Sequence, residues 1–169
     1  MFRCLALLFA FILTSCNITA PPRDNAQWQS EVHGVSVTWR ATAPAALGQV
    51  STGHVAGYAT AAPLGTSCVV DLDLTRSRYA LARIAAHEYM HCAQARYLLP
   101  GIPRPDLGAH FATGNEGLAE TYALAYVTAC GDSLRPLGWA DLATPTCAEA
   151  PDPRAVAATV ITPPDRVSP

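Results

Sequence analysis

Lysine is absent from this 169-residue chain, and all 11 of its basic side chains are arginines. They are scattered, and 13 acidic side chains leave a net charge of −2. Without a basic block, the chain lacks the positive surface that nucleic-acid binding requires. Charged residues make up only 14% of the chain, whereas half of the residues are hydrophobic. This composition is typical of a globular protein, and the length leaves room for one domain.

The apolar run at the N-terminus is too short to span a bilayer. It covers residues 4–13, follows Arg3, and has the length of the apolar core of a secretory signal peptide. We therefore predict a signal peptide over residues 1–15, which would be removed on export.

The end of this run, Leu13-Thr14-Ser15-Cys16, resembles the lipobox of bacterial lipoproteins, although Ser15 stands where glycine or alanine is more usual. The resemblance implies that Cys16 is lipidated and that the protein is held to a membrane of the cell envelope by a lipid anchor. Residues 16–27 would then form a tether. The alternative is ordinary cleavage near the same place, which leaves Cys16 without a lipid.

No CxxC pair occurs among the six cysteines, which argues against a zinc site built from cysteines. Once Cys4 is removed and Cys16 is lipidated, four cysteines remain, an even number that predicts disulfides in an exported protein. Three pairings are open. We favour Cys130 with Cys147, which are close in the chain, and therefore Cys68 with Cys92.

Glycine and proline are also missing between Thr75 and about Tyr97, where alanine, leucine and arginine dominate, and this predicts a helix capped by Thr75. A second helix is expected over about residues 115–130. The segment between them, residues 100–114, is rich in proline and glycine and reads as a loop.

Residues 28–73 read as β-structure, with a clear alternation at 35–39 and two shorter candidates at 54–60 and 67–72. A short helix is expected near residues 138–143. Five prolines in the last twenty residues predict a poorly ordered tail over 149–169. The expected fold class is thus α+β, with a small twisted sheet followed by two helices in a domain over residues 28–148.

The first helix carries an HExxH motif, His87-Glu88-Tyr89-Met90-His91, at its centre. Residues four apart lie on one face of a helix, so the two imidazoles can bind a single Zn²⁺. Glu88 projects beside the open side of such a metal, where it can act as general base and then as general acid. The alternative is a pair of histidines on a solvated or packed face.

A catalytic zinc site needs a third protein ligand, and the second helix offers Glu116 and Glu120, again four residues apart. We expect Glu116 to bind the metal and Glu120 to accept the N–H of a ligand histidine. Asp106 and His110 in the loop are rival third ligands. The alternative without a metal is that Glu116 and Glu120 are two exposed acidic residues near a helix N-terminus, where the helix dipole favours negative charge.

HExxH followed by Asn115-Glu116-Gly117-Leu118-Ala119-Glu120 resembles the gluzincins, the class of aminopeptidase N-like and thermolysin-like zinc peptidases. The resemblance covers residues 84–126 and implies the same roles for Glu116 and Glu120. It also implies that strand 68–72 is the edge strand along which a peptide lies. The interval of 24 residues between His91 and Glu116 is longer than is usual. A metzincin is excluded, because it requires glycine at position 94 and histidine at position 97, where this chain has Gln94 and Tyr97.

The sequence therefore predicts a zinc peptidase that hydrolyses peptide or protein substrates in the cell envelope, with His110 as the donor that stabilises the oxyanion. Two alternatives from other classes stay open. One is an envelope lipoprotein whose zinc only joins two helices, and the other is an interaction protein whose histidines bind no metal.

Overall fold

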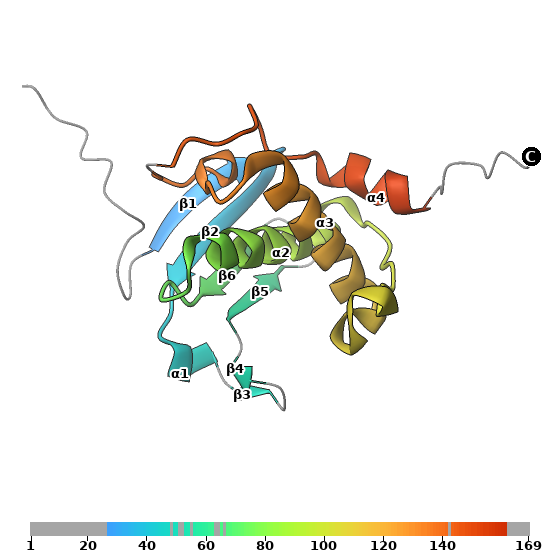
Figure 1. Ribbon diagram of the computed structural model, residues 1–169, viewed down its shortest axis with the longest axis horizontal. Coiled ribbons are helices and arrows are strands. Elements are labelled where there is room, and N and C mark those ends of the chain that lie inside the picture. The colour runs from blue at the N-terminus through green and yellow to red at the C-terminus, as the bar shows by residue number, and fades with distance from the viewer. Residues whose placement is uncertain are drawn as a thin grey trace, which may run out of the picture.

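The structure is a computed structural model that describes residues 27–47, 49–50, 53–54, 56–62, 65, 67–141 and 143–161. The predicted signal peptide at 1–15, the lipidation site Cys16 and nearly all of the tether lie outside these residues. A small four-stranded mixed sheet and the helices that cover it make up the fold (Figure 1), so the predicted α+β class is confirmed. No helix in the described part of the chain has both the length and the apolar character needed to cross a membrane.

The sheet begins with a hairpin of β1 (Gln27–Val32) and β2 (Val35–Ala41). His33 and Gly34 form its two-residue turn with φ of 48° and 72°, and a tight hairpin turn of this kind requires positive φ at both positions. Glycine adopts this conformation without strain.

The strand order β1-β2-β6-β5 corrects the prediction that residues 68–72 form the edge strand. That segment, β6 (Cys68–Leu72), is internal, because it pairs in parallel with β2 and antiparallel with β5 (Gly57–Ala61). The parallel pairing needs a crossover, and strand alternation in the sequence does not reveal one. The intervening chain contains α1 (Pro44–Leu47) and the short strands β3 (Gln49–Val50) and β4 (Gly53–His54). β5 is therefore an edge strand of the sheet, and it lies beside the helix that carries the HExxH motif.

Helix α2 (Arg78–Tyr97) begins later than predicted, with Ser77 as N-cap instead of Thr75. The reason is Asp73, whose carboxylate accepts hydrogen bonds from the backbone N–H of Thr75 at 2.9 Å and from its hydroxyl at 2.6 Å. These bonds hold Thr75 in a turn, and the Ser77 hydroxyl then accepts from the N–H of Ala80.

The core lies between the sheet and two crossing helices, α2 and α3 (Gly114–Cys130), as Figure 1 shows. The sheet contributes alternate residues of β2 and β6, as expected for a sheet with one face buried. The helices contribute small and aromatic side chains that are fully buried. The largest of these core residues are Trp39, Val70, Leu72, Tyr89, Met90, Leu118, Tyr122 and Tyr126.

Two disulfides fasten this core, and their pairing is the one that we favoured from the sequence. Cys68 in β6 is bonded to Cys92 in α2, which joins the sheet to the helix that carries the HExxH motif. Cys130, the last residue of α3, is bonded to Cys147 in the following segment. The first bond places a covalent link directly beside His91.

The C-terminal part differs from its prediction in two ways. The described residues of this stretch, 138–141 and 143, form no helix; the 3-10 turn η4 (Arg135–Leu137) lies just before them, and Gly138 follows it with a φ of 80°. In place of a poorly ordered tail, α4 (Pro153–Ile161) packs on α3 and buries Ala157. Proline at the first position of a helix is favourable, so Pro153 starts this helix and does not disrupt it. Residues 162–169 of the predicted tail lie outside the described part.

Candidate metal centre

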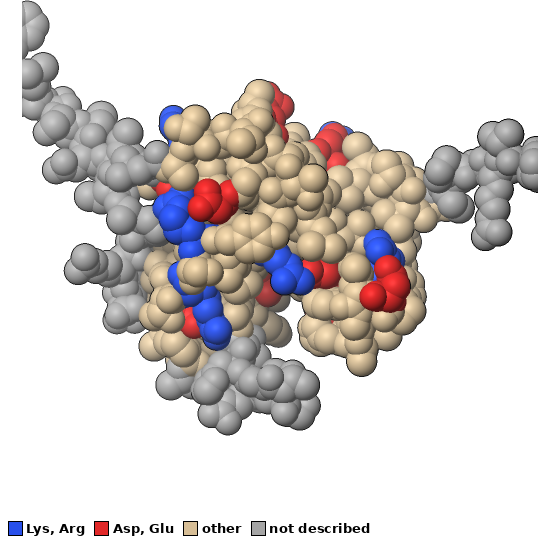
Figure 2. Space-filling view, viewed as in Figure 1, with Lys and Arg blue, Asp and Glu red and all other residues tan. Residues whose placement is uncertain are grey.

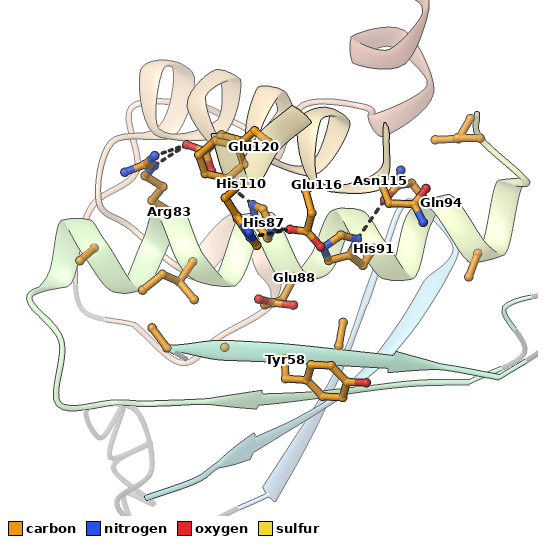
Figure 3. A pocket seen from close by; sticks show the side chains of 18 of the residues that line it. Tyr58, Arg83, His87, Glu88, His91, Gln94, His110, Asn115, Glu116 and Glu120 are labelled. Carbon is orange, nitrogen blue, oxygen red and sulfur yellow. Dashed lines mark hydrogen bonds and ion pairs between the residues drawn. The ribbon is translucent and has the colours of Figure 1, made fainter. Parts of the chain in front are cut away.

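Helix α2 places His87 and His91 one turn apart on the side of the helix that faces α3 (Figure 3). Both imidazoles are mostly buried, with side-chain exposures of 12% and 21%. Their rings stand 5.0 Å apart and nearly perpendicular. Each ring directs its Nε2 atom toward Glu116, so the spacing of the motif produces two nitrogen donors that face a common point.

Glu116, in the first turn of α3, supplies oxygens to both rings. Its Oε2 lies 3.0 Å from Nε2 of His87, and its Oε1 lies 3.5 Å from Nε2 of His91. One atom from each of the three residues fits within a group whose members are all within 4.8 Å of one another, which is compact enough to hold a metal ion. The structure therefore brings together all three residues that the sequence nominated as ligands.

Gly117 explains how α3 comes so close to the preceding loop. A Cβ at this position would lie 2.2 Å from the carbonyl oxygen of Ile102 and 2.6 Å from the backbone N of Arg104, so no other residue fits without displacing backbone. The contact orients the start of α3, and with it the Glu116 side chain, toward α2. The glycine of the Asn-Glu-Gly segment is thus a packing requirement of the site.

The second ring nitrogen of His87 is held by Glu120. The Nδ1 of His87 lies 3.2 Å from Glu120 Oε2, as we predicted from the four-residue spacing of the two glutamates. Arg83, one helical turn before His87, donates from Nε to Glu120 Oε1 at 2.8 Å and also from its Nη2. Arg83 was not predicted, although its position four residues before a ligand was a usable signal.

The second ring nitrogen of His91 is held by Gln94, a contact that sequence reasoning also missed. Its Oε1 lies 3.1 Å from His91 Nδ1, and the Gln94 side chain is buried. The signal available in the sequence was again helical spacing, because Gln94 follows His91 by three residues. In both histidines, Nδ1 is therefore hydrogen-bonded to a neighbouring side chain, as is usual for histidines that bind metals through the other ring nitrogen.

These contacts set the protonation of the metal-free site. Burial lowers the pKa of His87, but its hydrogen bonds to Glu116 and Glu120 outweigh this and raise the pKa to about 9. The same hydrogen bonds, from His87 and His91, hold the pKa of Glu116 well below its usual range. Burial raises the pKa of Glu120, yet the bonds from His87 and Arg83 leave it lowered. The metal-free cluster is thus a protonated imidazole between two carboxylates, a place that a cation can take over.

Glu88 points away from the three ligands toward strand β5 and is buried (Figure 3). Burial raises the pKa of its carboxyl, and the charges of His87 and His91 counteract only part of this rise. Strand β5 approaches because position 57 is glycine, where a Cβ would come within 3.0 Å of Glu88 Oε1 and 2.7 Å of Ile84. Glu88 therefore lies between the ligand cluster and the free edge of the sheet, in a setting that suits a proton acceptor.

A cleft of about 1180 Å³ opens over these groups. One wall is β5, and the opposite wall includes His110 and Phe111 of the 3-10 turn η3 (Ala109–Ala112), which follows the 3-10 turn η2 (Pro105–Leu107). Figure 2 shows the hollow between these two parts, on a face with few charged side chains. In the described part of the chain four large hydrophobic residues are exposed, and three of them, Tyr58, Tyr79 and Leu98, line the cleft. The cleft therefore offers apolar surface beside a compact polar cluster.

The two rival ligands from the loop have different positions. Asp106 is outside the cluster, because it is exposed and paired with Arg104, whose Nη2 lies 2.6 Å from Asp106 Oδ2. His110, our candidate for the oxyanion donor, lies on η3 with its side chain 72% exposed, and its Nε2 is 3.2 Å from Glu116 Oε2. It borders the cluster from the solvent side.

Tyr122 and Tyr126, the other aromatic residues near Glu116 in sequence, are buried in the core. Their hydroxyls donate to the carbonyls of Pro151 and Ser133. Neither residue lines the cleft. The donors available to a bound substrate therefore come from other residues around the rim.

Comparison with known proteins adds no relative: no family model, no curated protein and no solved structure matches this chain.

Proposed function

We propose that this protein is a zinc-dependent peptidase of the gluzincin type, acting on peptides or proteins in the cell envelope. The observation that carries the proposal is the convergence of His87, His91 and Glu116, with Glu88 beside them in an open cleft. Two imidazoles and one carboxylate are the donor set of many catalytic zinc sites.

The distances support zinc. Ligands held at about 2.0–2.1 Å around a tetrahedral zinc ion lie about 3.3 Å from one another. Each imidazole has a Glu116 oxygen near this distance, Oε2 at 3.0 Å from His87 and Oε1 at 3.5 Å from His91. Bound zinc would supply a Lewis acid that polarises the scissile carbonyl and lowers the pKa of water.

The chain's own residues divide the remaining work. Glu88 takes the proton from the attacking water and passes it to the leaving amine, a task for which its raised pKa is suited. Strand β5 presents the free edge of the sheet directly beside Glu88, so an extended peptide can add to it through main-chain hydrogen bonds. The cleft side chains Tyr58, Ile84 and Phe111 shield the reacting atoms from water.

The test compares the wild-type protein with three variants, all purified without a nickel column. Glu88→Gln is expected to keep its zinc and to lose peptidase activity on unfolded casein by about 10²–10⁴-fold, because a general base is removed. Glu116→Ala is expected to lose both zinc and activity. The control is Glu149→Gln, at an exposed carboxylate far from the cleft in sequence, which should keep both.

Wild-type protein without zinc would overturn the proposal. So would zinc that persists in Glu116→Ala, because another residue would then be the third ligand. Wild-type protein that holds zinc but cleaves neither casein nor unstructured peptides would replace the peptidase with a zinc-binding protein of structural role.

A further inference from the structure

Among the described residues that line the cleft, Gln94 is the one with a fully buried side-chain atom that lacks a hydrogen-bond partner. It is 7% exposed, its Oε1 lies 3.1 Å from Nδ1 of His91, and its Nε2 is buried without a partner among the described residues. A buried amide N–H group without a partner is costly, so this arrangement needs a compensating reason.

The reason lies in which atom of the amide faces His91. With the oxygen toward His91, Nδ1 must carry a proton, so the neutral ring has its lone pair on Nε2, the atom that faces Glu116. With the amide nitrogen toward His91, Nδ1 would have to accept and Nε2 would carry the proton. A protonated Nε2 cannot bind a metal, so only the first orientation is compatible with ligation.

We propose that Gln94 is a positioning residue that fixes His91 in its metal-binding tautomer, an inference that rests on the proposed zinc site. Gln94 acts through His91 and touches neither the metal nor the substrate. It performs for the second histidine the task that Glu120 performs for the first.

The neutral charge of Gln94 fits the charge balance of the site. The carboxylates of Glu88, Glu116 and Glu120 carry three negative charges, which a divalent zinc ion and the guanidinium of Arg83 balance. A second carboxylate behind His91 would leave the buried site with an excess negative charge. Glutamine supplies the required acceptor without that charge.

The experiment measures zinc affinity by competition with a chromophoric chelator, together with the absorption spectrum of the Co²⁺-substituted protein. Gln94→Met keeps the size of the side chain but removes the acceptor, and its zinc affinity should fall about 10–100-fold. Its cobalt spectrum should change, because His91 is no longer held in place. Gln94→Glu restores an acceptor and should recover part of the affinity, but less than the wild-type value because of the added negative charge.

Gln29→Met is the control, because Gln29 is exposed on β1 and bonds only to Thr38. It should leave affinity and spectrum unchanged. If Gln94→Met does not fold, Gln94→Asn replaces it: the amide stays, but its oxygen is withdrawn by one carbon and the same loss is expected. ¹⁵N spectra of His91 report the tautomer directly, with the proton on Nδ1 expected in the wild-type protein.

Wild-type affinity in Gln94→Met or Gln94→Asn, in a protein whose wild type binds zinc, would overturn this inference and leave the proposed function intact. Failure of the wild type to bind zinc would overturn both, and the two results are therefore distinguishable.

Discussion

The six buried polar side chains of the described structure form two groups with opposite character. Three of them, Asp73, Ser133 and Asp141, lie outside the cleft. Asp141 illustrates this group. Its carboxylate accepts hydrogen bonds from Arg78 at 2.7 Å and from the backbone N–H groups of Leu134 at 2.7 Å and Ala143 at 3.1 Å. Every member of this group bonds to other parts of the same chain.

The other three, Glu88, Gln94 and Glu120, line the cleft. Glu120 and Gln94 each bond to the back of a ligand histidine, Gln94 has a donor left over, and burial raises the pKa of Glu88. The hydrogen-bond partners of the first group come from the fold itself, whereas the second group has a donor without a partner among the described residues and a carboxyl with a raised pKa, as expected if these residues serve the proposed metal and substrate. The difference separates structural from functional polar residues without any relative to compare.

The sharpest way to test this comparison removes one carboxylate charge from each group. Glu120→Gln is expected to lower zinc affinity about 10–100-fold, because it weakens the acceptor behind His87. It should also lower the stability of the metal-free protein, because Arg83 and His87 donate to this buried carboxylate. Chelator competition and urea unfolding, measured on the same sample, check the two halves of this prediction.

Asp141→Asn is the counterpart, and its effect should be confined to stability. It places an amide where three groups donate to a carboxylate, so the free energy of unfolding should fall by about 1–3 kcal/mol. Zinc affinity should stay within about twofold of wild type, since no ligand depends on Asp141. A large loss of zinc affinity in this variant would break the distinction between the two groups.

The same aspartate predicts a pH dependence. Burial raises its pKa, but the hydrogen bonds from Arg78 and the backbone outweigh this, so the pKa is lowered in the folded protein. A lowered pKa stabilises the fold at pH values above the unfolded value of about 3.9, and the stabilisation is lost as the pH falls through the folded pKa. In the metal-free protein, unfolding free energy should therefore decline below about pH 4, and less steeply in Asp141→Asn.

The smallest effect is expected from the arginines that hold these carboxylates. Arg83 is 42% exposed, so its bond to Glu120 is partly screened by solvent. Arg83→Met should lower zinc affinity only about two- to fivefold. Arg78→Met, on the same helix but bonded to Asp141, should lower stability and leave zinc affinity unchanged. Equal zinc affinities in the two variants would contradict the role of Arg83.

The sequence predicted the parts of the site that depend on spacing within one helix. His87, Glu88 and His91 are fixed by the period of α2, and the relation of Glu116 to Glu120 by that of α3. Arg83 and Gln94 obey the same spacing rules but were not recognised, because arginine and glutamine on a helix surface are ordinary and only three-dimensional contacts show their partners.

The fold was predictable at the level of its class and its main helices, and less so where distant segments meet. The position of β6 inside the sheet depends on a parallel pairing with β2 across a crossover. The tail was misjudged because composition treats every proline alike, whereas Pro153 occupies the first position of α4 and Asp152 accepts from the N–H of Arg154 at 2.8 Å. The local sequence pattern shows neither which distant strands pair nor which position of a helix a proline occupies.

The bond between Cys68 and Cys92 has a consequence for how the cleft can adapt. It joins the metal-binding helix to β6, and β6 pairs with β5, so the helix and the strand wall of the cleft form one covalently braced body. The opposite wall, at η3, carries no disulfide among the described residues and rests on α3. A substrate of the proposed peptidase would therefore displace this second wall more readily than the first, while the disulfide limits the movement of α2, which carries Glu88, relative to β6.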